Sequence, residues 1–152
     1  MKNNLNPKQQ LGKYGELTVT ARLIDEGREV YFPAVDDHGI DMMIITRDTI
    51  QGDGSLPEHY PFQEIQVKTL KEGGLFVFTC RNPRPNYWFV FYVKATGLFW
   101  LINSVELVKR EVSSPNHADR PNEGAYTVSL ATRTRITPKN ERFLVKDFDR
   151  IP

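Results

Sequence analysis

Four polar side chains in the first half of the chain could do chemistry together. Glu16 lies in a segment of helical spacing, Asp41 directly follows Gly39-Ile40, and Gln66 and Lys68 are two residues apart in an alternating segment. Residues two apart on a strand point to the same face, so we expect Gln66 and Lys68 to stand side by side. Two carboxylates, an amide and an ammonium would then form one small polar site if the fold brings their elements together.

The strand that carries Gln66 and Lys68 has the clearest pattern in the sequence. Over residues 62–70, Ile65 and Val67 alternate with polar residues. This period of two predicts a strand with one buried face and one polar face. The functional side chains would all lie on the polar face.

The elements before this strand are predicted by caps and apolar runs. Asn6 and Pro7 suit an N-cap and a first helical residue, so we expect a helix over 7–26, with apolar residues at helical spacing at Tyr14, Leu17, Ala21 and Ile24. Strands are expected over 28–32 and 40–46; the second is almost continuously apolar, as in a strand buried on both faces. Glu16 would lie on the helix and Asp41 at the start of the second strand.

The remaining elements follow from apolar runs and turn residues. We expect a loop over 47–61, an apolar strand ending at Cys80, and a hairpin over 88–93 and 98–102, with its aromatic residues in the core. Asn103 and Glu106 have the spacing of a capping box, which predicts a short helix ending near Ser113. A polar loop over 113–124, a strand through 126–130 and a final helix capped by Thr137-Pro138 complete the prediction.

Composition predicts one cytoplasmic domain spanning residues 1–152. No apolar run approaches the roughly 20 residues that a membrane span needs, and the N-terminus lacks a signal-peptide pattern. Cys80 is the lone cysteine, and the three histidines have no zinc spacing. The net charge of +1 hides an asymmetry, because residues 1–80 hold 8 Lys/Arg and 12 Asp/Glu, whereas residues 81–152 hold 12 and 7. An acidic metal centre in the first half and phosphate contacts from the second are compatible with that division.

The order of these motifs resembles a known nuclease superfamily. Gly15-Glu16, Gly39-Ile40-Asp41 and Ile65–Thr69 are similar to the core of the PD-(D/E)XK nucleases, in particular to uncharacterised bacterial members with a Gln-x-Lys variant. The resemblance covers residues 12–70 and leaves the C-terminal hairpin, strand and helix of residues 75–152 outside it. It implies an α/β fold of the restriction-endonuclease-like class: a mixed central sheet flanked by helices, in which an N-terminal helix precedes a β-meander.

The resemblance also implies an activity, hydrolysis of nucleic-acid phosphodiesters, with DNA as the expected substrate and Mg²⁺ or Mn²⁺ as the cofactor. Asp41 would be the principal metal ligand, supported by Glu16, Gln66 and the carbonyl of Val67, because magnesium prefers hard oxygen ligands. Lys68 would orient the attacking water or stabilise charge in the transition state.

Gln66 is the departure from the family pattern, in which this position is usually Glu or Asp. Glu64 lies about 6 to 7 Å away on the same face and is a secondary candidate ligand. The loss of one charge leaves an alternative open, namely a non-catalytic nucleic-acid-binding or protein-interaction module on a degenerate nuclease fold. Asp36 and Asp37 are better explained as turn residues.

Several residues near the motifs are candidates to contact nucleic acid. The basic ones could equally be a solvated surface, a glycine could serve tight helix packing, and a turn histidine is often merely exposed. The candidates are Gly12, His38, Lys71, Arg81 and Arg84. Because so small a chain has little room for separate recognition elements, specificity would come from a partner protein or from a homodimer.

Overall fold

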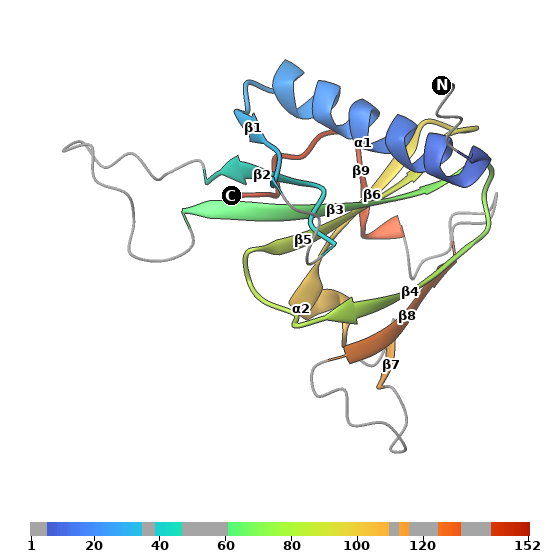
Figure 1. Cartoon of the computed structure of the whole chain (residues 1–152). Coiled ribbons are helices and arrows are strands. Elements are labelled where there is room, and N and C mark those ends of the chain that lie inside the picture. The colour runs from blue at the N-terminus through green and yellow to red at the C-terminus, as the bar shows by residue number, and fades with distance from the viewer. Residues whose placement is uncertain (1–5, 35–38, 47–60, 110–112, 116–124, 132–140) are drawn as a thin grey trace.

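The computed structural model describes residues 6–34, 39–46, 61–109, 113–115, 125–131 and 141–152. Its elements form three layers, in which helix α1 (Pro7–Asp25) lies over one face of a six-stranded sheet and a smaller sheet lies against the other face (Figure 1). No helix in the described part of the chain is long and apolar enough to cross a membrane.

Helix α1 begins where the sequence predicts it. Asn6 accepts a hydrogen bond from the Gln9 N–H at 3.0 Å, the Gln9 side chain accepts one from the Asn6 N–H, and Pro7 takes the first helical position. This capping box satisfies backbone donors that no residue inside the helix can reach. The predicted helix and its cap are therefore confirmed.

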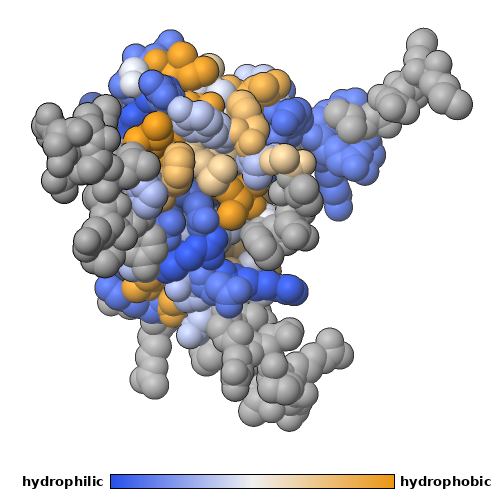
Figure 2. Space-filling model, turned by 60° about the vertical axis from the view of Figure 1, so that its left-hand side comes forward, coloured by the Kyte–Doolittle hydropathy of each residue, from blue (hydrophilic) through white to orange (hydrophobic). Residues whose placement is uncertain are grey.

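The apolar spacing that predicts α1 lies on its outer side. Tyr14, Leu17 and Ile24 are 43%, 56% and 57% exposed. Apolar residues appear at the top of Figure 2, at the level of α1 in Figure 1. The face that packs on the sheet is instead made of small and branched residues: Gly15, Val19, Thr20 and Leu23.

The large sheet has the order β1-β2-β3-β5-β6-β9. Its strands are β1 (Val30–Tyr31), β2 (Met42–Ile45), β3 (Phe62–Leu70), β5 (Tyr87–Val93), β6 (Leu98–Asn103) and β9 (Leu144–Val145). All neighbouring pairs are antiparallel except β3 and β5, which are parallel, so the sheet is mixed. The N-terminal helix, the β1-β2-β3 meander and the β5-β6 hairpin confirm the predicted α/β class.

Strand β2 departs from its prediction. Met42 and Ile44 are buried, but Met43 and Ile45 are only half-buried, so the strand is not covered on both faces. The hydrophobic cluster on that face is built mainly from β4, β5, β6 and α2 and does not include Met43 or Ile45. Strands β1 and β2 are also shorter than the expected segments 28–32 and 40–46.

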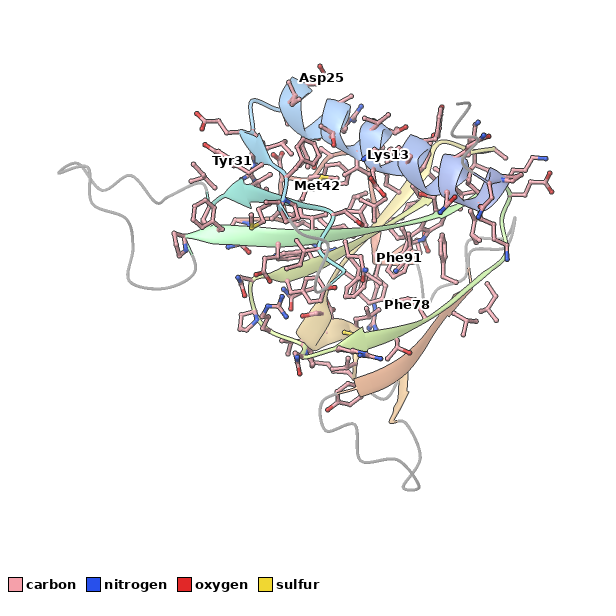
Figure 3. The ribbon with its side chains drawn as sticks, in the orientation of Figure 1. Lys13, Asp25, Tyr31, Met42, Phe78 and Phe91 are labelled. Atoms are coloured by element: carbon pink, nitrogen blue, oxygen red, sulfur yellow. The ribbon has the colours of Figure 1, made fainter. Side chains whose placement is uncertain are left out.

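Two hydrophobic cores lie on the two faces of the large sheet. Residues of α1 pack with Met42, Ile65 and Val67 on one face, and aromatic residues of β5 pack with β4 and α2 on the other. Figure 3 shows Met42 between the sheet and α1, and Phe78 and Phe91 between the sheet and β4. Every residue of β5 is buried, which confirms that most of the aromatic hairpin belongs to the core.

The small sheet joins segments far apart in sequence. Strands β4 (Leu75–Arg81), β8 (Ala125–Ala131) and β7 (Ser113–Pro115) pair antiparallel in the order β4-β8-β7. Two predictions are wrong here: residues 113–115 form a strand because they pair with β8, and α2 (Ser104–Leu107) is a single turn that ends before Ser113. The predicted loop over 47–61, apart from its last residue, and the Thr137-Pro138 cap lie outside the described residues.

Candidate functional site

Asp41 lies at the point where β2 stops pairing with β3. The ladder runs from Ile45 opposite Phe62 to Met42 opposite Ile65, and the Asp41 N–H then donates to the Ile65 carbonyl at 2.9 Å. Beyond that point β2 no longer offers backbone partners to this edge of β3.

The Asp41 carboxylate accepts the next β3 hydrogen bond, just beyond the end of the ladder. The Val67 N–H donates to Asp41 Oδ2 at 2.6 Å, a short charge-assisted hydrogen bond. A strand residue directs its N–H and C=O to the same side, so the Val67 carbonyl faces the same edge as the carboxylate. The structure thus brings Asp41 and Val67 together, and the contacted residue lies between Gln66 and Lys68.

Gln66 is held by two neighbours. Its Oε1 accepts a hydrogen bond from the Tyr87 hydroxyl at 3.0 Å, and its Nε2 lies only 2.5 Å from where a Cβ of residue 39 would be. Gly39 has φ +69, a backbone conformation that side chains rarely adopt. The backbone conformation therefore favours glycine at position 39, and a side chain there would displace the Gln66 amide.

Lys68 points to the face of β3 opposite α1. It is half-buried, and its Nζ lies 5.6 Å from the centre of the Phe78 ring on β4, within the range of a cation–π contact. The ammonium group therefore lies between the large sheet and β4, on the same face of β3 as Gln66.

Glu16 lies on α1 beside the closest contact between this helix and β3. A Cβ on Gly15 would lie 1.8 Å from Thr69 Oγ1, so the helix crosses the strand one residue beyond Lys68. The Glu16 carboxylate forms an ion pair with Lys13 at 2.8 Å and is 26% exposed. The structure places Glu16 near β3 through its helix, on the face opposite Lys68.

Glu64 and Arg84 neutralise each other. The Arg84 Nε donates to Glu64 Oε2 at 2.6 Å, and the guanidinium lies 4.4 Å from the centre of the Tyr87 ring. Ser104 holds the Arg84 backbone by accepting from its N–H at 2.9 Å and donating to its carbonyl at 2.8 Å. Glu64 thus serves an ion pair, and Arg84 has a structural role in addition to any contact with nucleic acid.

A polar groove of about 640 Å³ runs beside Gln66. Exposed Arg81 and Thr79 come from β4, whereas Gln66 comes from β3. The groove is lined by Gly39, Ile40, Glu64, Gln66, Thr79, Arg81, Asn82, Arg84 and Tyr87. Figure 2 shows hydrophilic side chains gathered in the middle of the face that it presents. The groove joins the predicted motif to the predicted basic residues.

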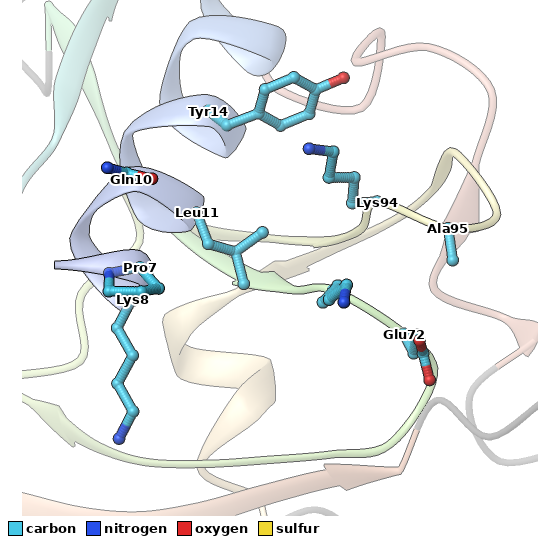
Figure 4. A pocket seen from close by; sticks show the side chains of 9 residues that line it. Pro7, Lys8, Gln10, Leu11, Tyr14, Glu72, Lys94 and Ala95 are labelled. Carbon is cyan, nitrogen blue, oxygen red and sulfur yellow. The ribbon is translucent and has the colours of Figure 1, made fainter.

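A second groove of about 760 Å³ lies at the start of α1 (Figure 4). Lys8, Lys71 and Lys94 line it together with Leu11 and Tyr14, and the Lys94 Nζ lies 4.0 Å from the centre of the Tyr14 ring. Lys71, a predicted nucleic-acid contact, therefore belongs to this groove and not to the one beside Gln66.

The two remaining predicted contacts have different outcomes. His38 lies outside the described residues. Gly12 has no atom within 4 Å of its Cβ position, so it is not the glycine that packs against the sheet; Gly15 is. Tyr87 was not predicted as a site residue, because within a run of core aromatics no local signal shows where its hydroxyl points.

Burial suppresses ionisation of two groups beside this site. Burial raises the pKa of Tyr87 far above its usual range, so its hydroxyl stays a neutral donor. Burial also raises the pKa of the Cys80 thiol to about 11. Neither group is suited to act as a nucleophile near neutral pH.

The donor set suits a hard cation that keeps several waters. Among the residues that the structure describes, no three His, Cys, Asp or Glu side chains gather to hold a metal ion by themselves. Asp41 and the Val67 carbonyl supply oxygen at one strand edge. Magnesium is commonly held by one or two carboxylates together with waters and substrate phosphates. The residues present therefore fit Mg²⁺ or Mn²⁺ better than zinc.

Comparison with known proteins identifies the fold but not the family. No family model and no curated protein matches the sequence. A solved structure of a bacterial homing endonuclease, I-Ssp6803I, matches at a TM-score of 0.55 over 91% of this chain and 89% of that chain, with 16% sequence identity. The chain has a nuclease-like fold. At this identity the match concerns the fold alone, and the predicted site residues stay predictions.

Proposed function

We propose that the chain is a metal-dependent endonuclease of the PD-(D/E)XK type that acts in the cytoplasm on DNA phosphodiester bonds. The observation that carries the proposal is the hydrogen bond from the Val67 N–H to the Asp41 carboxylate. It brings the Gly39-Ile40-Asp41 and Ile65–Thr69 parts of the sequence motif into contact at an open strand edge. The nuclease-like fold and the adjoining polar groove support the same function.

Four residues of the motif have distinct roles in this proposal. Asp41 is the principal ligand for Mg²⁺ or Mn²⁺, and the Val67 carbonyl offers a second oxygen. Glu16, which lies on the opposite face of β3, would have to leave its ion pair with Lys13 to assist through water. A metal ion bound there would lower the pKa of a water molecule and polarise the scissile phosphate. Lys68 holds positive charge on the face of β3 that carries Gln66, where it stabilises the developing negative charge.

The positions of the two grooves suggest that a duplex substrate lies along the motif strand. The groove of Gln66 and Arg81 adjoins the motif strand on one side, and the groove of Lys71 and Lys94 lies near the end of that strand. Between Glu64 and Lys71 the strand would span about 23 Å, at about 3.3 Å per residue. That length corresponds to about seven base pairs of duplex at 3.4 Å each.

The test is cleavage of supercoiled plasmid with Mg²⁺, with Mn²⁺ and with EDTA. We expect nicking or cutting that needs the metal and that falls at least about 100-fold in Asp41→Ala and Lys68→Ala, because each removes a charge at the reacting centre. Asp25→Ala and Lys146→Ala are matched controls, since both side chains are exposed and lie outside the motif. Cleavage that persists in EDTA, or that survives both motif variants, would overturn the proposal.

The second candidate is a nucleic-acid-binding or protein-interaction module without catalysis, favoured by the neutral Gln66 in place of a carboxylate. Thermal unfolding with and without Mn²⁺ separates the two functions, because a ligand that binds only the native state must raise the midpoint. No shift with metal, combined with DNA binding, would favour a nucleic-acid-binding module. Binding of neither would leave the protein-interaction role.

A further inference from the structure

A relay of side-chain contacts, from Tyr87 through Gln66 to Gly39, supports the turn that leads into Asp41. Tyr87 on β5 donates its hydroxyl to Gln66 Oε1, and Gln66 Nε2 fills the space where residue 39 would have a side chain. Two residues after this glycine, Asp41 meets the Val67 N–H. The relay therefore runs from the core strand to the loop that carries the principal candidate ligand.

The base of this relay is buried and held by several contacts. Tyr87 is only 3% exposed, and the Arg84 guanidinium lies over its ring. Arg84 is fixed in turn by Glu64 and Ser104. Gln66, by contrast, is a long side chain with several rotatable bonds, and it loses rotamer entropy when it is ordered. The Tyr87 hydroxyl supplies a fixed partner that selects one orientation of the amide.

We infer that Tyr87 and Gln66 are positioning residues: Tyr87 orients the Gln66 amide, and the amide holds the Gly39 turn so that the Asp41 carboxylate lies on the Val67 N–H. The consequence for catalysis rests on the proposed function, but the positioning itself does not. The relay also explains why an amide suits this position. A carboxylate at residue 66 would add a second negative charge beside that of Asp41, whereas the amide packs against the turn without repulsion.

The Val67 amide proton reports this arrangement without any need for activity. Its acceptor is the Asp41 carboxylate, so its hydrogen exchange should accelerate when the turn loosens. The measurement is the exchange rate of the Val67 amide relative to that of the Val90 amide in the core of β5, followed by NMR. The ratio removes any uniform loss of stability, because global unfolding accelerates both amides.

The variants are Tyr87→Phe and Gln66→Ala, with Tyr92→Phe as the matched control. Tyr92 is a buried tyrosine on the same strand but on the opposite face, stacked on Tyr14. We expect the exchange ratio to rise at least tenfold in Tyr87→Phe and in Gln66→Ala, to rise no further in the double variant, and to stay unchanged in Tyr92→Phe. An unchanged ratio in Tyr87→Phe would overturn the inference, as would an equal rise in the control.

A second measurement separates this inference from the proposed function. If the enzyme is active, Tyr87→Phe should raise the Mn²⁺ concentration for half-maximal cleavage at least threefold, with little change in the rate at saturating Mn²⁺. A raised exchange ratio in a protein that neither cleaves DNA nor binds Mn²⁺ would retain the positioning role and reject the nuclease. Metal-dependent cleavage with an unchanged exchange ratio would retain the nuclease and reject the positioning role.

Discussion

The contact between Gly15 and Thr69 sets how closely α1 approaches the motif strand, and it predicts a substitution with a definite sign. A Cβ at residue 15 would lie 1.8 Å from Thr69 Oγ1, 2.9 Å from Thr69 Cβ and 3.1 Å from Thr69 Cγ2. Rotating the threonine side chain could remove the first and third contacts but not the second, because the backbone fixes Cβ. Gly15→Ala must therefore push the helix away from the sheet.

The cost follows from two opposing terms. Overpacking of this kind costs about 3 kcal/mol at the upper end of its usual range, and replacing glycine by alanine in a helix returns about 1 kcal/mol. We expect Gly15→Ala to lower the free energy of unfolding by about 2 kcal/mol. For a chain of this length that corresponds to a fall of about 4 to 8 °C in the unfolding midpoint. In a Thr69→Ala background the loss should shrink to about 1 kcal/mol or less, because only the Cβ contact remains.

The same helix provides the control. Gly12 lies one turn earlier and has nothing within 4 Å of its Cβ position, so Gly12→Ala should stabilise the protein by about 0.5 to 1 kcal/mol. The assay is urea unfolding followed by circular dichroism, with the slope compared between variants to exclude changes in the denatured state. Equal stability of Gly12→Ala and Gly15→Ala would refute the close packing of α1 on β3.

Two further predictions concern the second groove and the buried thiol. If Lys8, Lys71 and Lys94 each contact a phosphate, replacing all three by alanine should reduce the salt-dependence slope of duplex binding by about 2.7. Lys146→Ala, near the other end of α1, should leave the slope unchanged. The slopes are measured by fluorescence-anisotropy titration, and equal slopes for the triple variant and the natural sequence would contradict the phosphate contacts. Burial raises the pKa of the Cys80 thiol to about 11, above its ordinary value of 9.0, so the folded state favours the neutral thiol. The folded state therefore becomes less stable relative to the unfolded state as the pH rises from 9 to 11. We expect iodoacetamide to label native Cys80 at pH 8 at least tenfold more slowly than the urea-unfolded chain, and mass spectrometry showing equal rates would contradict its burial.

The elements that could be predicted from sequence are those whose signal is local. Strand β3 spans residues 62–70 as predicted, because a buried residue and a polar residue alternate along it. The start of α1 was predictable because Asn6, Pro7 and Gln9 form a self-contained cap. The β5-β6 hairpin was predictable because two apolar runs flank a short turn that contains Gly97, which has φ +68.

The parts that could not be predicted depend on contacts between distant residues. Spacing does not reveal which of Gly12 and Gly15 faces the sheet, since both lie on the same helix. Residues 113–115 contain two serines and a proline, and only their pairing with β8 makes them a strand. The Tyr87 hydroxyl reaches Gln66 because β3 and β5 are parallel neighbours, a pairing that no local pattern indicates. The motif supplies candidate site residues, but it does not show which contacts hold them in place.

The most direct test of the proposed nuclease is the Asp41→Asn variant. Asparagine keeps an oxygen that can accept the Val67 hydrogen bond but removes the charge that would bind the metal, so the fold should be retained while the site is lost. The measurement is the initial rate of plasmid cleavage at saturating Mn²⁺, with the unfolding midpoint determined on the same preparation. We expect a rate at least about 100-fold below that of the natural sequence and a midpoint within about 2 °C of it. Cleavage by Asp41→Asn at the undiminished rate would contradict the assignment of Asp41 as the principal metal ligand.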